Sequence, residues 1–223
     1  MTLTTVPDAP ADAEQAWLAP AVHMAVVDED VIVLDSRTDA YTALAGAAAF
    51  LTIADGSVTA AAEVIAELKA AGLVVGAQGP ARRLLPSHPT RALALPERPA
   101  RRFADAAGFW SAWFRARRLE RAPLIDILAE GPPRSRSRAV SEPEVGRLTA
   151  TFVRLLPWAP GQGACLYRAY LLRTLLRRAG ADAQWVFGVR TWPFSAHCWL
   201  QLGDAVLDDD PDRVGAYTPI MTV

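Results

Sequence analysis

The stretch GQGACLYRAYLLRTLLRRAG, residues 161–180, decides how the C-terminal half of the chain folds. Glycines precede Cys165, and apolar residues then recur at helical spacing as far as Gly180, a residue type that commonly ends a helix. We therefore expect Cys165 at a helix N-terminus, where the helix dipole and unpaired backbone N–H groups stabilise a thiolate. The same N–H groups can hold an oxyanion. The alternative for a free cysteine, and the commoner one, is a small buried hydrophobe.

A histidine follows on a predicted strand. Residues 184–190, QWVFGVR, alternate as a β-strand does, and residues 197–202, HCWLQL, form the next strand. Alternation places His197 and Cys198 on opposite faces, which weakens Cys198 as a nucleophile. A helix that carries a cysteine and packs on a sheet that carries a histidine predicts a Cys–His pair. The alternative is a histidine that serves only the core or the surface.

Three consecutive aspartates, Asp208, Asp209 and Asp210, offer a third group. If residues 203–204 form a two-residue hairpin loop, the first and third aspartates share the face of His197. A three-residue loop shifts the register by one and turns the middle aspartate that way. Periodicity leaves both registers open, and it also leaves open a solvated acidic turn.

The order of these groups is similar to that of the transglutaminase-like cysteine peptidases. In detail the chain resembles the leader peptidases of lasso peptide biosynthesis: CLYRAYLL at 165–172, FSAHCWL at 194–200 and VLDD at 206–209 keep that family's order and spacing. Cys198 replaces the family's usual alanine. The resemblance covers about residues 105–223. It implies a cysteine-bearing helix on an antiparallel sheet, with Asp209 as the acid and no metal or cofactor.

The resemblance also implies a reaction. Cys165 attacks the carbonyl at the junction of leader and core in a ribosomal precursor peptide, His197 moves the proton, and Asp209 holds the imidazole. Gln162 is a candidate side chain for the oxyanion. The implied partners are the leader of the precursor peptide and an ATP-dependent cyclase similar to asparagine synthetase. Two other functions stay open: transglutaminase-like acyl transfer, and a non-catalytic adaptor that binds the leader for the cyclase.

The N-terminal part is expected to form a smaller domain. Residues 1–21 read as a flexible tail, and short strands follow at 22–27, 31–35 and 40–44. An alanine-rich helical segment then runs to Ala54. Ser57 is expected to cap a second helix that ends at Gly72.

This order resembles the winged-helix leader-recognition domain related to PqqD, through the stretch LDSRTDAYTAL at 34–44. In that family the leader adds to the edge of the third strand and packs against the last helix. The resemblance thus implies a groove with these residues: Tyr41, Thr42, Ala43, Leu44, Glu63 and Glu67. The alternative is an ordinary small domain whose edge is merely capped.

The expected organisation is a recognition domain at 22–75, a linker at 76–102 and a peptidase domain at 103–223. The fold class is α+β, with a winged-helix-like domain followed by a transglutaminase- or papain-like domain.

The composition of the chain excludes several classes of protein. Hydrophobic residues make up 52% of the chain and charged residues 21%, which is enough for well-packed cores. The net charge of −1 predicts no field that attracts nucleic acid. Apolar runs are too short for a membrane span, and two cysteines are too few for a disulfide framework. We therefore expect a cytoplasmic protein without a nucleic-acid or membrane partner.

Overall fold

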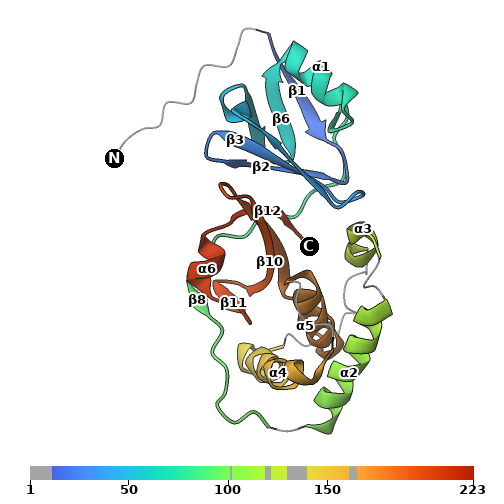
Figure 1. Ribbon diagram of the computed structural model, residues 1–223, viewed down its shortest axis with the longest axis vertical. Helices are drawn as coiled ribbons and strands as arrows, with labels where there is room; N and C mark the ends of the chain where they lie inside the picture. The colour runs from blue at the N-terminus through green and yellow to red at the C-terminus, as the bar shows by residue number, and fades with distance from the viewer. Residues whose placement is uncertain (1–11, 101, 119–121, 130–139, 161–164) are drawn as a thin grey trace. The chain divides into compact units, whose positions relative to one another are not determined.

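The computed structural model describes residues 12–100, 102–118, 122–129, 140–160 and 165–223. The chain divides into two compact units, Met1–Leu84 and Leu85–Val223 (Figure 1). Both units combine helices with mainly antiparallel sheets, which confirms the α+β class. Within the described ranges, none of the helices has both the length and the apolar character that a membrane span needs.

Two antiparallel sheets make up the N-terminal unit. The first is the meander β2-β3-β4, whose strands agree with the sequence prediction. Its strands are β2 (Val22–Val27), β3 (Asp30–Asp35) and β4 (Ala40–Leu44). The second sheet has the order β5-β6-β1-β7. Its strands are β1 (Ala13–Leu18), β5 (Leu51–Ala54), β6 (Ser57–Ala61) and β7 (Val74–Val75).

The predicted flexible tail over residues 1–21 is wrong for residues 13–18, while residues 1–11 lie outside the described part. Residues 13–18 form β1, which pairs with β6 on one side and with β7 on the other. Ala16 and Leu18 are buried in the core of this unit. Glu14 and Gln15 interrupt the apolar residues of this strand, so β1 is recognisable only through its distant partners, which a local pattern does not contain.

The predicted helix up to Ala54 and the predicted cap at Ser57 are also wrong. A 3₁₀ turn at Ala47–Ala49 is followed by β5, and Ser57 begins β6. Asp55 and Gly56 have φ values of 50° and 78°, the left-handed conformation of a tight hairpin turn. Alanine-rich composition favoured a helix, whereas the Asp-Gly pair favoured the hairpin that forms. The α-helix of this unit, α1 (Ala62–Ala70), begins after β6 and packs on β1, β6 and β7.

The predicted linker, residues 76–102, is divided between the two units, and each unit makes contacts with its own part of the segment. Within the N-terminal unit, the Arg82 guanidinium donates to the carbonyls of Leu18, Ala19 and Val22 at 3.2, 2.7 and 2.8 Å. Within the C-terminal unit, β8 (Arg91–Ala92) pairs in parallel with the strand that follows the hairpin loop at 203–204. These contacts hold Arg82 and residues 91–92 of the segment on folded structure.

The C-terminal unit contains a five-stranded sheet of order β12-β9-β10-β11-β8. Four of these strands are β9 (Gln184–Arg190), β10 (Ser195–Leu202), β11 (Ala205–Leu207) and β12 (Thr218–Thr222). The helix α5 (Cys165–Ala179) packs on β10, as the sequence predicts, and it packs in turn on α2 and α4 (Figure 1). The remaining helices of the unit are α2 (Phe103–Arg118), α3 (Leu124–Leu128), α4 (Glu142–Leu155) and α6 (Pro211–Gly215).

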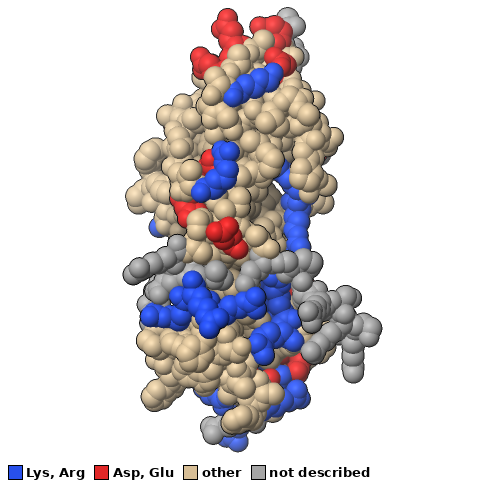
Figure 2. Space-filling view, turned by 90° about the vertical axis from the view of Figure 1, so that its right-hand side faces the viewer, with Lys and Arg blue, Asp and Glu red and all other residues tan. Residues whose placement is uncertain are grey.

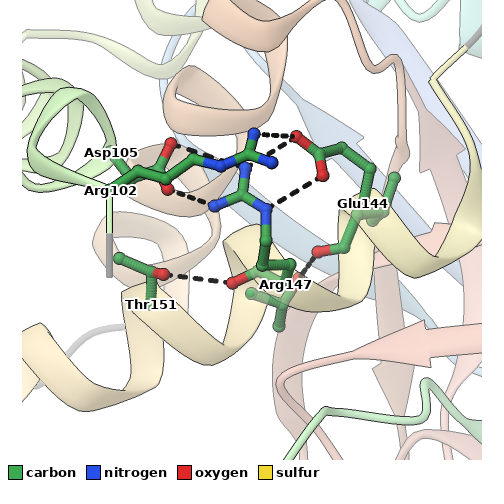
Figure 3. A network of polar contacts seen from close by, with 7 residues as sticks. Arg102, Asp105, Glu144, Arg147 and Thr151 are labelled. Carbon is green, nitrogen blue, oxygen red and sulfur yellow. Dashed lines mark hydrogen bonds and ion pairs between the residues drawn. The ribbon is translucent and has the colours of Figure 1, made fainter. Parts of the chain in front are cut away.

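A buried arginine joins α2 to α4 (Figure 3). Arg147 is 8% exposed, and its guanidinium donates to Glu144 at 2.9 and 2.6 Å and to the carboxylate of Asp105 on α2. Arg102 reaches the same Glu144 from the solvent side at 3.2 Å, with a side chain that is 57% exposed. The buried arginine is therefore the cation on which two carboxylates depend.

Replacing Arg147 with Met should lower the free energy of unfolding by about 3 kcal/mol, because Asp105 would keep a buried charge without its partner. The matched change Arg102→Met should cost less than about 1 kcal/mol, since that ion pair is exposed. Urea denaturation followed by tryptophan fluorescence measures both. Equal losses for the two variants would contradict this account of the network.

Candidate active site

Cys165 is the first residue of α5, so the predicted helix N-terminus is found in the structure. Its side chain is partly exposed, at an open pocket of about 480 Å³. The residues lining this pocket include Cys165, Arg168, His197, Cys198, Asp209 and Tyr217. Gln162, the predicted oxyanion side chain, lies outside the described residues. The pocket is therefore lined by a thiol from α5 and by titratable groups from β10, from the turn after β11 and from the segment between α6 and β12.

His197 lies in β10 and is 7% exposed. Its Nε2 is 2.6 Å from Oδ2 of Asp209, a charge-assisted hydrogen bond. The backbone N–H of Asp210 donates to the other carboxylate oxygen of Asp209 at 2.9 Å. Asp209 is thus held on both oxygens, and it fixes the orientation of the imidazole.

The position of Asp209 follows from an unusual end of β11. The pairing of Leu202 with Ala205 shows a two-residue loop, the register in which strand alternation would turn Asp208 toward His197. However, β11 ends at Leu207, and Asp208 has a φ of 56°, which breaks the alternation. The chain turns at this residue, and the next aspartate meets the histidine instead.

Arg168, which lies on the same helix as Cys165, forms an ion pair with Asp208 in this turn. Arg168 Nε lies 2.5 Å from Oδ2 of Asp208, and its Nη2 lies 2.8 Å from Oδ1, a bidentate pair. The Asp208 side chain is 7% exposed, and the pair raises the pKa of Arg168. Since Arg168 follows Cys165 by one helical turn, α5 positions both the nucleophile and the acidic turn. The sequence prediction missed this role, although Cys-x-x-Arg on a helix already places both residues on one face.

The packing around His197 depends on a glycine. His197 stacks on Trp199 at 6.2 Å between ring centroids, and its ring centroid is 5.3 Å from that of Tyr217. A Cβ on Gly188, which pairs with His197 across the strands, would lie 2.8 Å from the Trp199 ring and 2.9 Å from Tyr217. The absence of a side chain at Gly188 therefore lets the two aromatic residues flank the imidazole.

The electrostatics favour a thiolate–imidazolium pair. Hydrogen bonds from Cys198 and from the His197 ring to the Cys165 sulfur outweigh burial and lower the pKa of Cys165 to about 4. Hydrogen bonds to Asp209 and Cys165 raise the pKa of His197 to about 9. Burial opposes ionisation of Asp209, but the hydrogen bonds from His197 and Asp210 lower its pKa. At neutral pH the site therefore holds S⁻, imidazolium and carboxylate in a row.

The residues of the predicted leader groove lie on one strand and one helix of the N-terminal unit. Residues Tyr41 to Leu44 lie in β4, which pairs with β3 and forms one edge of the sheet β2-β3-β4. Glu63 and Glu67 are exposed on α1, which packs on the strands of the other sheet. The strand edge belongs to one sheet and the acidic helix packs on the other, and one joint groove formed by both stays a prediction.

The rate at which iodoacetamide alkylates Cys165 should have its midpoint near pH 4, far below the ordinary thiol value, because the thiolate is stabilised in the folded protein. Below the midpoint the sulfur is protonated, so the rate should fall about tenfold per pH unit. His197→Gln should raise the midpoint, since it removes the imidazolium. Peptide mapping by mass spectrometry separates the two cysteines, and a midpoint near 8 or 9 in the folded wild type would refute the ion pair.

Comparisons with known proteins identify the superfamily of the region that contains these residues. Residues 110–222, half of the chain, match the model of the Transglutaminase-like superfamily, and this range contains Cys165, His197 and Asp209. The "Microcin J25-processing protein McjB" of Escherichia coli is 42% identical over 48 residues, 22% of this chain and 23% of that protein. The match therefore spans less than a quarter of that relative. No solved structure matches at a significant level. With half of its length and the entire Cys–His–Asp constellation inside the matched range, the chain belongs to the transglutaminase-like superfamily.

Proposed function

We propose that this protein is a cysteine peptidase that binds a lasso peptide precursor and removes its leader. The observation that carries the proposal is that Cys165, His197 and Asp209 line one open pocket, with the His197 imidazole hydrogen-bonded to Asp209. The superfamily match and the partial similarity to a microcin-processing protein support a peptide substrate.

In the first half of the reaction, the Cys165 thiolate attacks the carbonyl carbon at the leader–core junction. The carbonyl oxygen becomes an oxyanion at the N-terminal end of α5, where the first backbone N–H groups have no acceptor within the helix. The tetrahedral intermediate collapses when the C–N bond breaks. The His197 imidazolium gives its proton to the leaving amine, which departs as the N-terminus of the core.

In the second half, the leader remains as a thioester on Cys165. His197, now neutral, takes a proton from water, and the resulting hydroxide attacks the thioester carbonyl. Cleavage of the C–S bond releases the leader with a free carboxylate and restores the thiolate–imidazolium pair. Asp209 keeps its hydrogen bond to Nε2 throughout, so the other ring nitrogen faces the reacting atoms.

The N-terminal unit is proposed to hold the leader by strand addition to β4. Residues 40–44 of β4 are exposed or half-buried, and β4 borders its sheet, which is the arrangement that such pairing requires. Residues 1–84 contain 4 Lys and Arg but 11 Asp and Glu, whereas residues 85–223 contain 19 and 13. Red atoms accordingly gather on the N-terminal unit in the space-filling view (Figure 2). The leader is therefore expected to be basic, and binding should weaken as salt rises.

The implied next step belongs to another enzyme. Leader removal leaves a core with a free α-amine, and ring closure onto a carboxyl group requires that group to be activated. An ATP-dependent cyclase similar to asparagine synthetase is the proposed partner for this step.

Incubation of the purified protein with a synthetic precursor should release leader and core, and Cys165→Ala should abolish the release. Asp209→Asn should lower kcat/KM on the order of a thousandfold, because the imidazole loses its orienting anion. Arg102→Met, far from the pocket in the sequence and on the exposed side of the α2–α4 network, is the control and should cleave like wild type.

The product masses decide among the functions. A free carboxylate on the leader supports hydrolysis, whereas a larger conjugate joined through an amide would show acyl transfer instead. Unchanged processing by Cys165→Ala would contradict catalysis and leave the role of an adaptor that binds the leader.

A further inference from the structure

The three consecutive aspartates after β11 have three different partners. Asp208 pairs with Arg168 of α5. Asp209 accepts from His197 of β10. The carboxylate of Asp210 accepts from a backbone N–H of α6 at 2.8 Å and so caps that helix. The proposed reaction uses the middle aspartate alone, and it assigns no role to the partner of the first one.

Two buried carboxylates lie beside one imidazole. The side chains of Asp208 and Asp209 are 7% and 12% exposed, and both line the pocket that His197 lines. The Nε2 atom of the ring carries a single proton, so one carboxylate at a time can accept it in a straight hydrogen bond. A buried carboxylate without a partner is strongly unfavourable. The aspartate that does not hold the ring therefore needs a cation of its own.

Arg168 supplies that cation from the helix of the nucleophile. Its Nε and Nη2 atoms lie 2.5 and 2.8 Å from the two carboxylate oxygens of Asp208, so both oxygens are engaged. A planar guanidinium makes such a two-point contact, whereas the ammonium group of a lysine acts as a single point charge. The pair therefore fixes the direction of the Asp208 carboxylate as well as its charge.

The strand register shows what this pair prevents. The two-residue loop between β10 and β11 belongs to the register in which continued alternation would turn Asp208 toward His197. The strand ends one residue earlier, at Leu207, and the Asp208 carboxylate is directed to α5 instead. Asp208 is thus the carboxylate that the register offers to the ring and that Arg168 withdraws from it.

We propose that Arg168 is a positioning residue that selects the acid of the site: it holds both oxygens of Asp208, keeps this carboxylate off the imidazole and leaves Nε2 to Asp209. The inference rests on the proposed function, in which His197 and Asp209 serve the nucleophile. Without Arg168 either aspartate accepts from the ring, and the imidazole loses its single orientation.

The first test compares the cost of Asp209→Asn in full-length proteins with and without Arg168. In the wild-type background this change should lower kcat/KM on the order of a thousandfold. In an Arg168→Met background it should cost less than about tenfold, because the released Asp208 takes over the ring, so the two changes are not additive. Adding Asp208→Asn to this double variant should restore the full loss.

The matched control is Arg213→Met. Arg213 also lines the pocket, and its Nη1 lies 3.8 Å from Oδ1 of Asp209, but its side chain is 63% exposed and does not hold Asp208. In this background Asp209→Asn should still cost about a thousandfold, because no second carboxylate is released.

An NMR titration of the His197 ring makes the same comparison without a substrate. The hydrogen bond to Asp209 raises the pKa of the ring, so Asp209→Asn should lower the titration midpoint by about one pH unit or more in the wild-type background. The same change should lower it much less in the Arg168→Met background. Failure of the wild type to cleave any precursor would count against the peptidase function alone, whereas this titration still tests Arg168.

Asp208→Asn tests the proposal with Arg168 in place, and it does so even if Arg168→Met fails to fold. Since Asp208 does not hold the ring, this variant should lose far less kcat/KM than Asp209→Asn and should shift the His197 midpoint far less. Equal costs of Asp209→Asn in the wild-type and Arg168→Met backgrounds would overturn the proposal. An Asp208→Asn variant as impaired as Asp209→Asn would overturn it as well.

Discussion

The ion pair between the Cys165 sulfur and the His197 imidazole is the interaction on which the rest of the C-terminal unit depends. Neither partner would be charged at neutral pH on its own, because an ordinary thiol keeps its proton and an ordinary imidazole has largely lost one. Each charge stabilises the other, and the Asp209 carboxylate holds the imidazole in place, with its Oδ2 at 2.6 Å from His197 Nε2. The pair makes the thiolate available before any substrate arrives.

The fold serves this pair through a small number of contacts. The helix α5 carries Cys165 at its first residue, and one turn later it carries Arg168, which pairs with Asp208. The tight loop after β10 brings the acidic turn back beside the histidine, and Gly188 leaves room for the aromatic residues around it. Behind α5, the buried network of Arg147 fixes α4 to α2, the helices on which α5 rests. Residues from widely separated parts of the chain thus determine the position of one sulfur atom.

Periodicity predicted the parts of the site that depend on local structure. The helix at Cys165 and the strand at His197 are found where the pattern of apolar residues places them. Asp209 followed from the family resemblance, since strand periodicity left both registers open. Asp208, whose left-handed conformation breaks the strand alternation, also forms an ion pair with Arg168, 40 residues earlier in the chain, and neither feature is visible in a local pattern.

In the N-terminal unit, the strand β1 escaped prediction because it pairs with β6, 40 to 48 residues later in the chain. The hairpin β5–β6 escaped prediction although its strands pair locally, with partners at most 9 residues apart in the chain. Alanine-rich segments carry a helical preference that such pairing overrides. Cys198 was set aside as a nucleophile because it faces away from His197, which the structure supports.

The most direct test of the central claim is an NMR titration of the His197 imidazole, assigned by comparison with His197→Gln among the three histidines of the chain. The account predicts that the ring stays protonated through neutral pH with a midpoint of about 9, and that Cys165→Ala lowers this midpoint. A wild-type ring that titrates at or below the ordinary histidine value of about 6.5 would contradict the ion pair.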